Sequence, residues 1–193
     1  MKMSNIAKTY ELLLNFFRST KSAPEIHDLK ERINRYDPEF TTDEIRSYKA
    51  LYITEITTPW FLGLNRGSYG LQSTFKCKYH SFPDYKCTCG FHSYKIIDAA
   101  FYESKLRFGT VVAEIDNYGD IIEHELGYRS EEQVIKKLFI HEECTKLTCK
   151  QRVTHLTRHR HLLLPRCLKH TGTERYSLDN INNIELEIFS TRT

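Results

Sequence analysis

Six cysteines, which fall into two short groups interleaved with histidines, constrain this 193-residue chain more than any other feature. Three lie within residues 77–89 and three within residues 144–167. Disulfide frameworks do not require neighbouring histidines, whereas zinc sites draw their ligands from both residue types. The chain begins without the uninterrupted apolar run and cleavage site of a secretory signal, so we expect a cytoplasmic protein with reduced thiols. We therefore interpret both groups as zinc sites.

The first group combines a Cys-x2-His pair with a Cys-x-Cys pair. Structural zinc takes four nitrogen or sulfur ligands in a tetrahedron, and a tight Cys-x2-His turn directs two of them to one point. Gly90 permits the left-handed backbone that such turns often need. The predicted ligands are Cys77, His80, Cys87 and Cys89, and His92 is the substitute. Four protein ligands leave no open coordination position, so we predict a structural rather than a catalytic site.

The second group offers two alternative ligand sets. One set consists of Cys144, Cys149, Cys167 and His170. Its Cys-x4-Cys and Cys-x2-His pairs are typical of zinc ribbons. In the other set Cys144 and Cys149 combine with His155 and His159, which would share one face of a helix. The segment between Cys149 and His155 is much shorter than in finger domains, so we prefer the ribbon set over this alternative and over a basic helix with incidental thiols.

Hydrophobic patterning predicts an α+β fold in three parts. Residues 1–50 form a helical subdomain, residues 51–140 an antiparallel β module with the first zinc site, and residues 141–193 a basic Cys/His-rich segment. In the first part we predict three helices, the third capped by Thr41 or Thr42. Further along the chain, β-branched and aromatic residues predict strands at 51–54, 71–75, 94–97 and 181–189.

The clearest element predicted from the sequence is a hairpin. Its arms are residues 109–115 and 120–125, joined by a turn at residues 116–119 that holds Asn and Gly. Ser130 and Gln133 have the spacing of a capping box and predict a short helix over residues 131–137. Residues 151–163 are also predicted to be helical.

Four short motifs stand in the middle of the chain: residues 80–83 (His-Ser-Phe-Pro), 87–91 (Cys-Thr-Cys-Gly-Phe), 109–112 (Gly-Thr-Val-Val) and 123–131 (Glu-His-Glu-Leu-Gly-Tyr-Arg-Ser-Glu). Together they resemble a family of small, uncharacterised bacterial proteins. Ser130 stands where that family usually has Ala. The similarity covers about residues 60–140 and supports the first four ligands and the hairpin as one module. It implies no activity.

Positive charge coincides with the two Cys/His groups. The whole chain carries only +3, but residues 62–110 carry +4 and residues 141–170 carry +5. Within the second block we predict that Arg152, Arg158 and Arg160 form a cationic surface. A phosphate backbone or an acidic protein patch would suit such a surface.

No motif for nucleotide binding, zinc proteolysis, hydrolysis at a nucleophile elbow or base deamination is present. We therefore predict no catalytic residues and expect a non-catalytic, zinc-stabilised binding protein, an adaptor or regulator that docks on a macromolecule rather than on a membrane. The alternative is a nucleic-acid-binding protein that uses the basic block at residues 141–170. A metal-dependent nuclease built on the second Cys/His group is the third hypothesis.

Overall fold

The computed structural model describes residues 40–41, 45–63, 68–77, 79–80 and 88–190. Its strands are β1 (Phe40–Thr41), β2 (Ile45–Glu55), β3 (Trp60–Gly63), β4 (Ser68–Gly70), β5 (Gln72–Thr74), β6 (Phe91–Tyr94), β7 (Val111–Glu123), β8 (Gly127–His141), β9 (His155–His159), β10 (Leu162–Arg166), β11 (Arg175–Ser177) and β12 (Glu185–Phe189). The helices are α3 (Ile97–Leu106) and the 3-10 turns η1 (Leu168–His170) and η2 (Leu178–Asn180).

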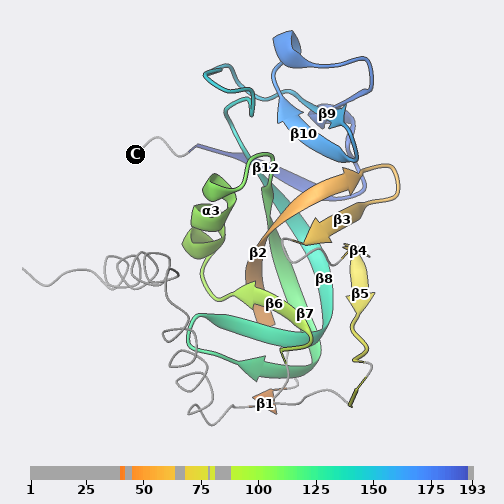
Figure 1. The fold of residues 1–193 in the computed structure, drawn as a ribbon, viewed down its shortest axis with the longest axis vertical. Helices are drawn as coiled ribbons and strands as arrows, with labels where there is room; N and C mark the ends of the chain where they lie inside the picture. Colours follow the sequence, from red (N-terminus) through yellow and green to blue (C-terminus); the bar gives the residue numbers. More distant parts are fainter. Residues whose placement is uncertain (1–39, 42–44, 64–67, 78, 81–87, 191–193) are drawn as a thin grey trace, which may run out of the picture.

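Strands β2, β7 and β8 form the centre of one sheet of twelve described strands. β7 pairs antiparallel with both β2 and β8, and β6 also pairs with both, so these four strands close into a ring. β-branched and other aliphatic side chains of β2, β7 and β8 alternate toward the inside of this ring, where they are buried. The same sheet continues from β2 through β10 to β9 and β11, at the end of the molecule opposite β1 (Figure 1).

Helix α3 covers the outside of the ring. Ala100 packs against Val112 and Phe139 of the sheet. The ring of Phe101 stacks on that of Phe189 in β12, with centroids 4.0 Å apart. β12 runs parallel to β8, so the end of the described chain is held against the same central strand as the helix (Figure 1).

The predicted α+β class with an N-terminal helical segment is wrong. The described residues form mostly antiparallel sheet and contain one α-helix, which the sequence did not predict. The third predicted helix would have included Ile45, but Ile45 begins the eleven-residue strand β2. Antiparallel pairing with β7 along residues 45–51 outweighs the local helix-start signal at Thr42. The first two predicted helices lie in residues 1–39, outside the described residues.

The predicted hairpin exists, but its turn is misplaced. β7 continues through residues 116–119 to Glu123, and the chain reverses only at residues 124–126. Asn117 is paired with Ile45 on one side and Gln133 on the other. Gly119 has φ of 73° at a point where the register between β7 and β8 shifts. A glycine at a β-bulge carries the same sequence signal as a glycine in a turn.

The two helices predicted after the hairpin are also wrong. Residues 131–137 belong to strand β8, and residues 155–166 form the β9–β10 hairpin. The strand predicted at residues 51–54 is confirmed within β2, and those predicted at residues 71–75 and 181–189 are confirmed in part, at Gln72–Thr74 (β5) and Glu185–Phe189 (β12). In residues 94–97 only Tyr94 is in a strand, because α3 begins at Ile97. The division of the chain into three parts stays a prediction.

Candidate metal centres

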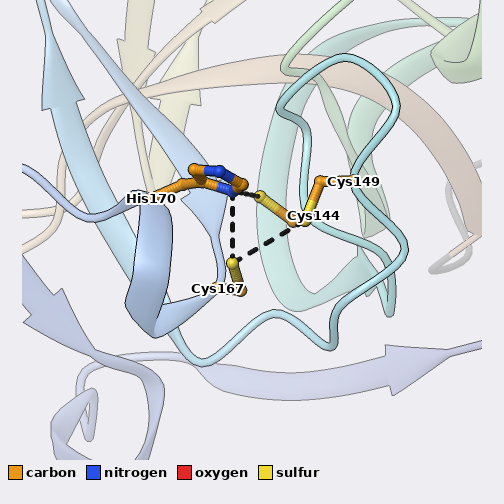
Figure 2. Close-up of side chains that lie close together, drawn as sticks. All are labelled: Cys144, Cys149, Cys167 and His170. Atoms are coloured by element: carbon orange, nitrogen blue, oxygen red, sulfur yellow. Dashed lines mark hydrogen bonds between the residues drawn. The ribbon is translucent and has the colours of Figure 1, made fainter.

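Four side chains converge where β8 and β10 end, and we call this group the second centre. Cys144 follows β8, Cys149 lies at the far end of a short loop, Cys167 follows β10 and His170 ends η1. Figure 2 shows the four side chains directed toward one another. Their ligand atoms all lie within 4.8 Å of one another, so the second centre can hold a metal ion.

The distances in the second centre have the size of a tetrahedral site. Ligand bonds of about 2.3 Å to sulfur and about 2.0 Å to nitrogen place two sulfurs about 3.8 Å apart, and a sulfur and a nitrogen about 3.6 Å apart. The Sγ atoms of Cys149 and Cys167 are 3.8 Å apart. His170 Nδ1 is 3.6 Å from Cys144 Sγ and 3.4 Å from Cys167 Sγ. The side chains therefore need little rearrangement to share one ion.

Backbone hydrogen bonds shape the loop that carries Cys144 and Cys149. The N–H of Lys146 donates to Cys144 Sγ at 3.4 Å, and the N–H of Cys149 donates to the carbonyl of Lys146 at 2.9 Å. Thr148 adopts a left-handed φ of 66°, which turns the chain back toward the site. The N–H of Thr145 donates to the carbonyl of Pro165, and this bond joins the loop to the end of β10.

The electrostatics of the second centre favour a thiolate on Cys144. Burial acts to raise the pKa of this thiol, but hydrogen bonds from the backbone N–H groups of Cys167 and Lys146 and from His170 outweigh it, and the pKa falls to about 6. Burial raises the pKa of the Cys167 thiol, and the neighbouring cysteines add to the rise. Since metals bind the thiolate form, a cation would release the proton from Cys167 on binding.

Of the two ligand sets predicted for the second group, the structure brings together the ribbon set. The other set would need His155 and His159, which lie on strand β9. His155 Nδ1 is 2.8 Å from the hydroxyl of Thr154, and His159 is exposed. The segment that carries them is a strand in the β9–β10 hairpin rather than a basic helix.

The first centre comprises Cys77, His80 and Cys89, which can also hold a metal ion. His80 Nε2 is 3.3 Å from Cys77 Sγ and 3.6 Å from Cys89 Sγ. Gly90 has a φ of 105°, the left-handed backbone predicted from its place after Cys89. The predicted ligand Cys87 lies outside the described residues.

The residues around the first centre show which side chains support it. The predicted substitute His92 is instead bound through Nε2 to the carbonyl of Thr88, at 2.9 Å. Arg129, which is 2% exposed, donates from Nη1 to the carbonyl of Cys89 at 3.2 Å. Sequence reasoning assigned no role to Arg129; its only signal was its place in the motif at residues 123–131.

The three arginines predicted as a cationic surface differ in their surroundings. Arg158 forms ion pairs with Glu55 at 3.0 Å and with Glu174 at 2.9 Å, and these carboxylates raise the pKa of its guanidinium. Arg152 and Arg160 are exposed, and Arg160 has a φ of 57° in the turn between β9 and β10. The charge of Arg158 is therefore already neutralised within the fold.

Comparisons with the models of protein families, with curated proteins and with solved structures found no match to this chain. Among the residues that the structure describes, no helix has the length and apolar character needed to cross a membrane.

Proposed function

We propose that this protein is a non-catalytic, zinc-stabilised binding protein, an adaptor or regulator that docks on a macromolecular partner. The observation that carries the proposal is the second centre, in which four ligand atoms lie within 4.8 Å of one another. Four protein ligands complete a tetrahedron and leave no position for a substrate or an activated water. A metal in such a site stabilises the loops around it.

Zinc is the ion that suits these ligands. The second centre offers three thiols and one imidazole, and the first centre offers two thiols and one imidazole among the described residues. Tetrahedral sulfur and nitrogen ligation selects zinc over magnesium and calcium, which prefer oxygen. Cys144 and Cys167 are buried, so the ion would be shielded from solvent on that side.

The test is the metal content of the purified full-length chain, measured by inductively coupled plasma mass spectrometry. We expect two zinc ions per chain, and one after His170→Ala, with a thermal midpoint about 5 to 10 °C lower because metal-binding free energy is folding free energy. The matched control His161→Ala removes an exposed histidine outside both centres and should change neither value. Absence of zinc from the wild-type protein, or equal zinc in both variants, contradicts the proposal.

Nucleic-acid binding is the second candidate function. It is favoured by Arg152 and Arg160, which are exposed and form no ion pair with a carboxylate among the described residues. Binding to phosphates should weaken steeply between about 50 and about 200 mM salt. A gel shift with a mixed-sequence oligonucleotide tests it: we expect a shift at low salt that is lost in Arg152→Ala/Arg160→Ala. No shift at low salt excludes this function.

A further inference from the structure

Three loops meet at the end of strand β10, beside the second centre. They are residues 105–109 (the last two residues of α3 and the three that follow), residues 144–149, and residues 167–170. The guanidinium of Arg166 lies 5.5 Å from the centre of the Phe108 ring, which joins the first loop to β10. The N–H and hydroxyl of Thr145 donate to the carbonyl of Pro165 at 3.1 and 2.6 Å, which joins the second. The third loop continues directly from β10. We call these three loops the knuckle surface.

The knuckle surface exposes an unusual share of apolar side chains. Seven large hydrophobic residues are exposed in the described part of the chain, and four of them lie on these loops. They are Leu106 (57% exposed), Phe108 (58%), Leu147 (82%) and Leu168 (63%). Single exposed leucines need no explanation, but four on three adjoining loops are typical of an interaction site.

Each of these apolar side chains has a basic neighbour in the sequence. Lys146 precedes Leu147, Lys169 follows Leu168, and Arg107 lies between Leu106 and Phe108. None of the three loops contains an acidic residue. Lys146 and Lys169 are exposed, and neither forms an ion pair with a described carboxylate. The knuckle surface therefore has positively charged side chains next to exposed apolar ones. It complements a partner surface on which carboxylates lie next to apolar side chains.

We propose that the knuckle surface binds an acidic peptide segment of a partner protein, in which Asp or Glu alternates with large apolar side chains. This proposal rests on the proposed function and names the chemistry of the partner. Apolar anchors at the centre of an interface provide most of the affinity, while surrounding charges provide specificity and a faster association. The metal holds two of the loops in place before binding, which lowers the entropic cost of association.

A protein segment fits this surface better than a nucleic acid or a membrane. Three of the four exposed apolar side chains are leucines, which neither stack on bases as aromatic rings do nor donate hydrogen bonds to phosphate. A bilayer favours an apolar face separated from a basic face, because its hydrocarbon lies beneath its headgroups. In the knuckle surface, each loop instead places a basic residue directly beside an apolar one, and the two kinds alternate along residues 105–108.

The experiment is a selection from a phage-displayed library of random peptides on the zinc-loaded, full-length protein. We expect the recovered peptides to be enriched in Asp and Glu together with Leu, Ile and Phe. A synthetic peptide of the recovered sequence should bind at least about tenfold more weakly to Lys146→Glu/Lys169→Glu and to Leu147→Ser/Leu168→Ser. Fluorescence anisotropy measures this change.

Control variants change similar residues elsewhere. Lys76→Glu and Ile96→Ser alter an exposed lysine and an exposed isoleucine outside the three loops, and they should bind the peptide as the wild type does. Zinc content and thermal midpoint are measured for every variant. A protein that binds zinc but no acidic peptide contradicts this proposal alone, whereas a protein without zinc contradicts the proposed function. The proposal is overturned if no acidic peptides are enriched, or if binding survives both knuckle variants. It is also overturned if phosphatidylserine vesicles or an oligonucleotide, rather than peptides, bind in a way that those variants abolish.

Discussion

At the scale of single residues, burial lowers the pKa of His124, which lies in the turn between β7 and β8. Burial lowers the pKa of His124 to about 4, and the positive charge of Arg129 lowers it further. Burial also lowers the pKa of His92 on the neighbouring strand β6. The folded protein thus holds these rings neutral at a pH where an unfolded chain would begin to protonate them.

Stability should therefore fall as the pH is lowered toward the folded-state pKa of His124. Between its ordinary value of 6.5 and about 4, the unfolded chain binds a proton at this position that the folded chain does not bind. Urea unfolding at about pH 7.5 and about pH 5.5 measures the effect. We expect His124→Gln to lose less stability between these two values than the wild type loses.

The exposed His161 provides the control for this measurement. His161→Gln leaves His124 and its surroundings unchanged, so it should keep the loss of stability at low pH that we attribute to His124. Equal pH dependence in His124→Gln and His161→Gln would show that His124 does not contribute to it.

At the scale of secondary structure, one amide holds the polar end of the strand ring together. Asn117 of β7 accepts hydrogen bonds at Oδ1 from Ser130 at 2.9 Å, Gln133 at 3.0 Å and Ser93 at 3.4 Å. Its Nδ2 donates to the hydroxyl of Ser47 in β2. All five residues are buried. The hydroxyl of Ser130 therefore has a defined partner.

Asn117→Ala should destabilise the protein by about 3 to 5 kcal/mol, because it leaves several buried donors without an acceptor. The free energy of unfolding in urea tests this expectation. The control Asp120→Ala changes an exposed residue of the same strand and should cost less than about 0.5 kcal/mol. If Asn117→Ala lowers the free energy of unfolding by less than about 1 kcal/mol, then a water molecule or a rearrangement of the neighbouring side chains replaces the hydrogen bonds of the amide.

At the scale of the whole molecule, the sheet and the second centre stabilise different regions. β7 and β8 are paired along most of their length and pack on the apolar core. The loop at residues 144–149 contains no strand, and a single bridge between Glu143 and Arg152 closes it. Metal binding would then be needed mainly where regular pairing ends.

Removal of metal by a chelator should loosen the loops at the metal centres before it loosens the central sheet. Hydrogen exchange followed by mass spectrometry should show faster exchange in residues 144–151 and 167–171, while β7 and β8 keep their protection. Added zinc should restore slow exchange. Uniform exchange across the chain after chelation would show that both regions unfold together.

The candidate metal ligands of this protein could be predicted from its sequence because metal ligands lie in short local patterns. The Cys-x2-His and Cys-x4-Cys spacings identified the side chains that the structure brings together in the second centre, and three of the four in the first. Strands in the middle of the chain were also predictable, since β-branched and aromatic residues mark them.

Two properties were decided only by the tertiary structure: the fold class, and which basic side chains stay free of ion pairs within the protein. Residues 45–50 and 131–137 contain adequate helix signals, but pairing with β7 makes both of them strands. Arg158 belongs to the basic block in the sequence, yet its partner Glu55 lies 103 residues away and neutralises it. Local spacing determines which ligands can share an ion, whereas strand pairing and ion pairs depend on contacts between distant residues that no short pattern records.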